Sequence, residues 1–104
     1  MTPTIAAVAT APGPAGIAVV RISGPQTQSI LERVVRTRRL ADHPREMRRI
    51  RVHGPENDEA IDDGLGVFFP GPRSFTGEDM AELHVHGGSQ NVRRVLSAIL
   101  QHGA

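Results

Sequence analysis

The sequence predicts an α+β domain in which a mostly antiparallel sheet is covered by two helices, in the order ββαβββα. Five short segments have the apolar, β-branched or alternating character of strands. Two longer segments instead place apolar residues on one face at helical spacing. The predicted strands are residues 4–10, 17–23, 45–53, 65–69 and 80–86, and the predicted helices are residues 25–37 and a segment that starts at Ser89.

The first half of the chain begins with two of these strands. The segment TIAAVAT runs into APGPAG, whose prolines and glycines predict a turn or loop. The segment IAVVRIS is nearly continuously apolar and contains one charge, Arg21. Ser23 and Gly24 then provide a helix cap, and Pro25 suits the first helical position, where its missing N–H is harmless. The apolar face of this first helix consists of Ile30, Leu31, Val34 and Val35.

The second half alternates polar loops with strands. Residues 38–44 are predicted as a loop, and GPENDEAIDDG, residues 54–64, as a polar turn or hairpin region. LGVFF supplies the fourth strand, and MAELHVH, which alternates, supplies the fifth. Gly87 and Gly88 end that strand, and Ser89 is placed to cap the second helix. The apolar face of the second helix consists of Val92, Val95, Leu96, Ile99 and Leu100.

Length and composition limit what the chain can be. At 104 residues, with 38% apolar and 22% charged residues, it is predicted to be one folded domain, 1–104, with a modest core that a partner subunit would help to complete. The absence of Cys excludes disulfides and thiolate metal clusters. No segment resembles a membrane span or a secretory signal, so we expect a soluble, cytoplasmic protein.

All 12 basic residues are Arg, and this has two consequences. A Walker-type phosphate loop needs a Lys, so the chain by itself is not expected to hydrolyse nucleotides in that way. Seven of the arginines fall within residues 36–51, where they could contact RNA phosphates. Because no aromatic residues are interleaved with them, a solvated face with Asp42 and Glu46 as partial partners is the simpler interpretation.

The fifth strand carries the most distinctive chemistry. Alternate side chains of a strand share a face, so Glu82, His84 and His86 point to one side. One interpretation is a metal site of two imidazoles and a carboxylate, although side chains on a flat strand splay apart and seldom converge on one ion. Another is a polar strand face that looks at solvent or at a subunit interface.

A pocket for a polar heterocycle is the third interpretation. A carboxylate such as Glu82 accepts two parallel hydrogen bonds from an amino-pyrimidine edge, as it does from a guanidinium. Gly87 and Gly88 would let a ligand approach the backbone near the start of the second helix. Arg21 could pair with Glu82 as an ion pair or contact an acidic ligand, and spacing does not separate these alternatives.

Two stretches together resemble a known family. TIAAVATAPGPAGIAVVRISGP, FFPGPRSFTGEDMAELHVHGG and the spacing between them are similar to the N-terminal domain of the MnmE/TrmE family of tRNA modification GTPases. The resemblance covers almost the whole chain. It implies one half of the folate-binding fold of the aminomethyltransferases, completed by a homodimer. The family loop close to PPGRGGI reads APGPAGI here, so Pro14 stands in place of the loop arginine.

The resemblance also implies a ligand and partners. In the family this domain binds a 5-formyl-tetrahydrofolate-type one-carbon carrier, and the matching residues here are Arg21 and Glu82, with His86, Gly87 and Gly88 shaping the pocket. The helical domain, the GTPase domain and a further folate-contacting Lys are absent from this sequence. GTP, Mg and K would bind only in that missing GTPase domain. MnmG (GidA) and tRNA would be partners of the full-length protein. A ligand-free dimerisation scaffold and a metal site at Glu82, His84 and His86 are the alternatives.

Overall fold

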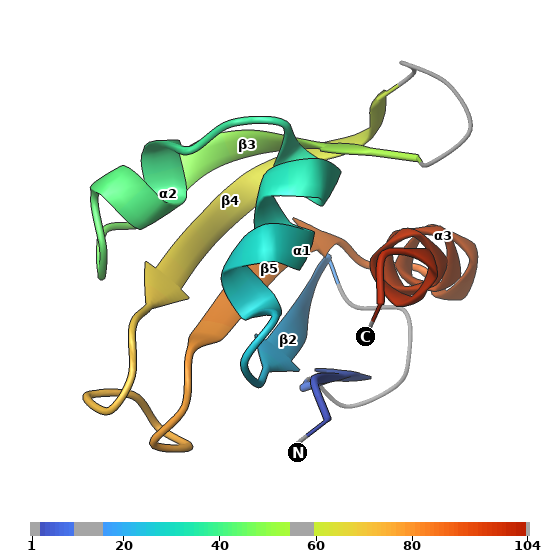
Figure 1. The fold of residues 1–104 in the computed structure, drawn as a ribbon. Coiled ribbons are helices and arrows are strands. Elements are labelled where there is room, and N and C mark those ends of the chain that lie inside the picture. Colours follow the sequence, from blue (N-terminus) through green and yellow to red (C-terminus); the bar gives the residue numbers. More distant parts are fainter. Residues whose placement is uncertain (1–2, 10–15, 55–59, 104) are drawn as a thin grey trace.

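The computed structural model describes residues 3–9, 16–54 and 60–103. Figure 1 shows an α+β domain with one five-stranded sheet, in the strand order β1-β2-β5-β4-β3. Every neighbouring pair of strands is antiparallel, as the sequence predicts. The strands are β1 (Ile5–Val8), β2 (Ile17–Ser23), β3 (Arg48–His53), β4 (Ala60–Phe69) and β5 (Met80–His86), and the helices are α1 (Thr27–Val35), α2 (Arg39–Asp42) and α3 (Ser89–Gln101).

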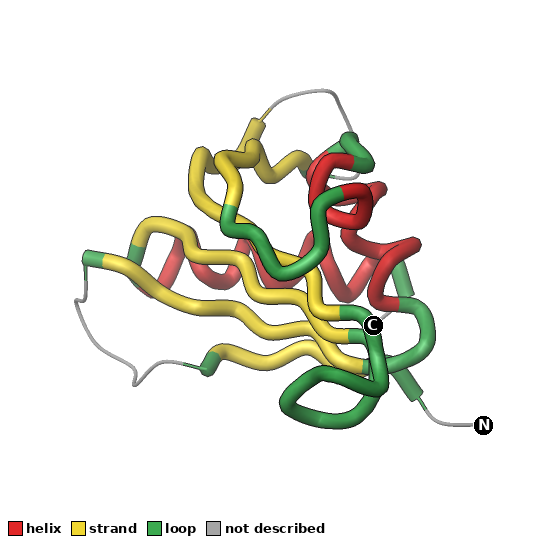
Figure 2. Tube along the Cα trace, turned by 90° about the vertical axis from the view of Figure 1, so that its left-hand side faces the viewer, coloured by secondary structure: helices red, strands yellow, loops and turns green. Residues whose placement is uncertain are grey.

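The helices cover one face of the sheet, and the core lies between the two layers. In Figure 1, α1 lies over the middle of the sheet, and α3 contacts both α1 and several strands. Viewed from the side in Figure 2, the strands run next to one another with the progressive twist usual for sheets. The buried core residues from the strands are Ala18, Val20, Ile22, Ile50, Val52, Phe68, Ala81, Leu83 and Val85, and those from the helices are Ile30, Leu31, Val34, Val35, Leu40, Val95 and Ile99.

The other face of the sheet carries no helix in the described part of the chain, and we call it the open face. Its side chains alternate with those of the core, so it presents the odd-numbered residues of β2 and the even-numbered residues of β5. Val67 and Met80 are buried on this face and do not belong to the main core cluster. The connection 70–79 projects beyond the ends of β4 and β5 and borders the open face (Figure 1).

Helix α1 begins later than predicted. Its N-cap is Gln26, so Pro25 precedes the helix instead of occupying its first position. The reason is tertiary, because the backbone N–H of Gln26 donates to Thr4 Oγ1 at 2.9 Å. Thr27, which is fully buried, donates its hydroxyl to the Gly24 carbonyl at 2.8 Å. Helix α3 instead begins one residue earlier than the predicted cap implies, because Gly88 is the N-cap and Ser89 is the first helical residue.

Two segments predicted as loops contain regular structure. The short helix α2 lies within predicted loop 38–44, where Leu40 is buried and anchors it to the core. Strand β4 begins at Ala60, five residues before the predicted start, and pairs its acidic end with β3. Strand β3 itself begins at Arg48, after Arg45 at a positive φ of 64°. The predicted APGPAG turn, apart from Gly16, and residues 55–59 lie outside the described residues.

Candidate functional site

The predicted residues Arg21 and Glu82 meet at the centre of the open face. They are direct cross-strand partners on β2 and β5, and Glu82 is also opposite Val67 of β4. Arg21 Nε and Nη2 donate to Glu82 Oε2 at 3.0 and 2.8 Å. The Arg21 side chain is 38% exposed and the Glu82 side chain 18% exposed, so the pair remains accessible from solvent. The ion pair, one of the two alternatives that the sequence left open for Arg21, is therefore present in the structure.

His84 completes this cluster from the next position on the same face of β5. Its Nε2 lies 3.2 Å from Glu82 Oε1, so both carboxylate oxygens have a partner. Burial raises the pKa of Glu82, but hydrogen bonds and charge from Arg21 and His84 outweigh it, and the net pKa lies below the ordinary 4.5. Glu82 is thus held as a carboxylate, the form that accepts hydrogen bonds.

An aromatic ring lies beside this cluster. It was not among the candidate site residues predicted from the sequence. Phe75, in the connection 70–79, has its ring centroid 5.5 Å from the guanidinium carbon of Arg21, within the range of a cation–π contact. The ring is 87% exposed, which is unusual for so large an apolar side chain. Its position depends on folding of the β4–β5 connection, so strand periodicity gave no signal for it.

The predicted residues His86, Gly87 and Gly88 lie farther along, at the end of β5. Glu82 and His86 are four positions apart on β5, or about 13 Å along the strand. The Gly87 N–H donates to the Gly16 carbonyl at 3.1 Å, which ties this end to the start of β2. Gly88 has a φ of 106°, a conformation that favours glycine, and caps α3. The structure therefore separates the five predicted residues into two groups: Arg21 and Glu82 pair across β2 and β5, and His86, Gly87 and Gly88 lie at the end of β5.

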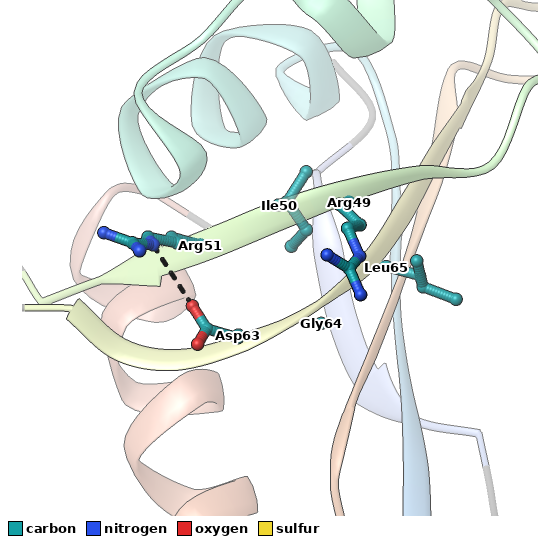
Figure 3. A pocket seen from close by; sticks show the side chains of 6 residues that line it. All are labelled: Arg49, Ile50, Arg51, Asp63, Gly64 and Leu65. Atoms are coloured by element: carbon teal, nitrogen blue, oxygen red, sulfur yellow. Dashed lines mark ion pairs between the residues drawn. The ribbon is translucent and has the colours of Figure 1, made fainter.

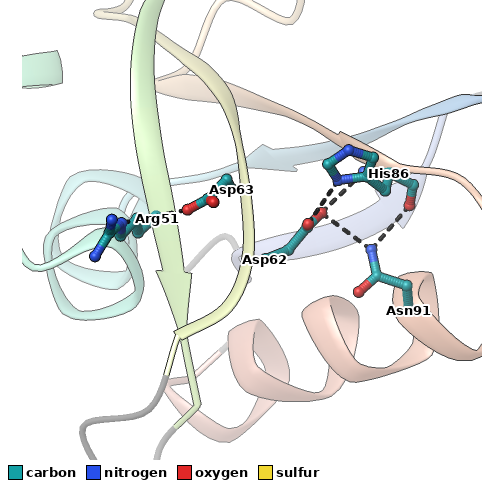
Figure 4. Close-up of polar contacts among 5 residues, drawn as sticks. All are labelled: Arg51, Asp62, Asp63, His86 and Asn91. Carbon is teal, nitrogen blue, oxygen red and sulfur yellow. Dashed lines mark hydrogen bonds and ion pairs between the residues drawn. The ribbon is translucent and has the colours of Figure 1, made fainter.

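Asp62 organises the second group, and the sequence analysis placed it in a turn. Its Oδ1 lies 2.7 Å from His86 Nδ1, and its Oδ2 accepts from the His86 backbone N–H at 2.8 Å and from Asn91 Nδ2 at 3.0 Å. Figure 4 shows this Asp62 cluster, which joins β4, β5 and α3. Burial raises the pKa of Asp62, but these hydrogen bonds outweigh it and hold the net pKa below 3.8.

The metal hypothesis does not fit this geometry. Glu82 and His84 are neighbours, but His86 turns to Asp62 at the strand end. Among the described residues, no three His, Cys, Asp or Glu side chains are placed to share an ion.

A hollow of about 620 Å³ lies on β3 and β4. Figure 3 shows the residues that line it, which are Arg49, Ile50, Arg51, Asp63, Gly64 and Leu65. Arg51 pairs with Asp63, with 3.3 Å between Nε and Oδ1. This hollow could not be predicted from local sequence patterns, because it forms only when β3 and β4 pair and bring residues 49–51 next to residues 63–65.

Other arginines of segment 36–51 form contacts within the domain. Arg48 lies 3.6 Å from Glu46, one of the two predicted acidic partners. Arg45 Nη2 donates to the carbonyls of Pro70 and Arg73 at 3.1 and 2.9 Å, and so holds the connection 70–79. No described helix is long and apolar enough to cross a membrane.

The fold and this geometry define a small α+β domain with a polar site on an uncovered sheet face. Residues 4–104 match the family model for the N-terminus of the GTP-binding protein TrmE. The chain is 51% identical over 102 residues to the tRNA modification GTPase MnmE of Roseiflexus sp., covering 97% of this chain and 22% of that protein. It is 49% identical over 98 residues to the MnmE protein of Parvibaculum lavamentivorans, covering 94% and 22%.

The similarity extends to the MnmE protein of Marinobacter nauticus, at 43% identity over 106 residues. That alignment covers 99% of this chain and 22% of the relative. The chain belongs to the MnmE/TrmE family and corresponds to its N-terminal domain. It spans about a fifth of the length of these relatives.

Proposed function

We propose that this chain is the folate-binding and dimerisation module of a tRNA modification GTPase, and that it holds a 5-formyl-tetrahydrofolate-type carrier on the open face. The observation that carries the proposal is the solvent-accessible Arg21–Glu82 pair, flanked by His84 and the exposed ring of Phe75. Together these groups offer a carboxylate acceptor, a cationic donor and an aromatic surface within one cluster.

Each group suits one part of a reduced pterin. Glu82 accepts two hydrogen bonds from the donors of the amino-pyrimidine edge. To make them, the ligand replaces Arg21 or His84 as a hydrogen-bond partner of the carboxylate. Arg21, once released, donates to a carbonyl or acidic group of the ligand. Phe75 stacks against the heterocycle. His86, Gly87 and Gly88 form the outer end of the same face.

The proposal extends to the parent protein. In the full-length cytoplasmic protein, this module would act as a homodimer in wobble-uridine modification with MnmG and tRNA, and GTP with its ions would bind in the separate GTPase domain. The names of the matched relatives support this wider role.

A calorimetric titration of 5-formyl-tetrahydrofolate into the chain tests the proposal. We expect saturable binding by the wild type and a loss of at least about tenfold in affinity for Glu82→Gln, because an amide offers one acceptor where the carboxylate offers two. The matched control is Glu32→Gln on α1, on the helix-covered side of the sheet, which should bind like the wild type. Absence of binding by the folded wild-type chain would reject the folate proposal and favour the ligand-free scaffold, in which Arg21 and Glu82 merely pair.

A further inference from the structure

The hollow on β3 and β4 has an excess of positive charge. Two guanidinium groups and one carboxylate line it. The Arg51–Asp63 pair is a weak surface contact, since its side chains are 73% and 74% exposed. In the part of the chain that the structure describes, no carboxylate forms an ion pair with Arg49, so its five N–H donors are available to an anion.

The strand register places the Arg49 side of the hollow near the Arg21–Glu82 cluster. Arg49 is the cross-strand partner of Leu65, and Leu65 is the cross-strand partner of His84, which contacts Glu82. Two strand spacings therefore separate Arg49 from His84, or about 10 Å. Figure 3 shows the Arg49 and Leu65 side chains next to each other. Leu65 is 40% exposed and provides apolar surface between Arg49 on one side and the Arg21–Glu82 cluster on the other.

We propose that this hollow is the subsite for the carboxylate end of the ligand, and that Arg49 binds it. The inference rests on the proposed function and defines which part of a folate the hollow takes. A pteroylglutamate has a hydrogen-bonding pyrimidine edge at one end, an aromatic spacer in the middle and carboxylates at the other end. The open face presents Glu82, Leu65 and Arg49 in the same order. The fork of a guanidinium matches a carboxylate in geometry as well as in charge.

A competing explanation is protection of the sheet edge. Strand β3 is an edge strand, and charged side chains on such strands discourage pairing with other chains. That role requires only a charge, so Lys would replace Arg49 without loss. Carboxylate binding in a fork requires the planar guanidinium, so Arg49→Lys should bind the ligand more weakly than the wild type.

The test compares two ligands by calorimetry, 5-formyl-tetrahydrofolate and 5-formyl-tetrahydropteroate, which lacks the glutamate. We expect Arg49→Gln to weaken binding of the folate roughly tenfold, the loss expected for one charge-assisted hydrogen bond, and to leave binding of the pteroate unchanged. The control is Arg38→Gln, which removes the same charge from an exposed position at the start of α2. Circular dichroism of each variant verifies that it is folded.

The outcomes separate this inference from the proposed function. If the wild type binds both ligands equally, or if Arg49→Gln and Arg38→Gln weaken the folate alike, the carboxylate subsite is rejected and the pterin site stands. Full binding by Arg49→Lys would reject recognition by the guanidinium fork. If the folded wild type binds neither ligand, the folate proposal fails and the subsite fails with it.

Discussion

At the scale of single residues, two carboxylates of this domain are held ionised by different partners. Glu82 lies against a permanent cation, whereas Asp62 lies against an imidazole, a backbone N–H and a side-chain amide. The Asp62 side chain is only 10% exposed. Its hydrogen bonds therefore act where solvent competes least, and they join three elements of the fold.

We predict that Asp62→Asn lowers the free energy of unfolding and makes it less dependent on pH in the acid range. Because the folded-state pKa of Asp62 lies below 3.8, the carboxylate stabilises the fold above that pH, and the contribution disappears as pH falls toward the folded-state pKa. The substitution should cost about 1–3 kcal/mol near neutral pH, because it removes one acceptor oxygen from a hydrogen-bonded side chain that is only 10% exposed. Urea unfolding at a series of pH values measures both effects.

The neighbouring Asp63 provides a matched control. Its single ion pair, with Arg51, is exposed, so Asp63→Asn should change the free energy of unfolding by less than about 0.5 kcal/mol. Equal losses in the two variants would contradict a special role for Asp62.

At the scale of elements, strands with a regular hydrophobic pattern could be predicted from the sequence. Segments that are strands because of contacts across the sheet could not. Strands β2 and β5 have the predicted bounds, because burial on one face imposes alternation that can be read locally. The start of β4 was read as a turn, since acidic residues are depleted in strands. Its acids have partners on β3 and β5, far away in sequence. The same limit applies to the site: Arg21 and Glu82 were singled out from the sequence and their ion pair was one of two alternatives, whereas the contacts of Asp62 and Phe75 were not predicted.

Gly64 in β4 lies where β4 packs closely against β5, which leads to a prediction about substitutions at this position. A Cβ on Gly64 would lie 2.2 Å from the carbonyl oxygen of His84, a backbone atom that cannot rotate away. Gly64→Ala should therefore push β4 away from β5 and lower the free energy of unfolding of the domain by about 1–3 kcal/mol, the usual cost of overpacking. Thermal unfolding measures the loss.

Gly54→Ala serves as the control for this change, because its Cβ would meet only the Ile61 side chain, at an ordinary 3.5 Å. A melting temperature for Gly64→Ala equal to that of the control would show that the two strands separate easily.

At the scale of the whole molecule, the sheet is covered on one side only. Helices bury one face, while the open face and its borders leave Ile5, Ile17, Leu65 and Phe75 exposed. A chain of 104 residues buries a limited share of its surface, so association through this face would add to a modest core. The proposed ligand site lies on the same face, so a dimer formed through this face would bring ligand binding and self-association onto one surface.

We predict that the chain dimerises through the open face and that Ile17→Glu prevents it. Ile17 is 62% exposed on β2, and a buried carboxylate without a partner at an interface opposes association. Leu100→Glu is the matched control, because Leu100 is 47% exposed on α3, in the helical layer. Light scattering at high micromolar concentration should give a dimer mass for the wild type and the control, and a monomer mass for Ile17→Glu. A monomeric wild type would refute dimerisation of this chain by itself, and a dimeric Ile17→Glu would place the interface elsewhere.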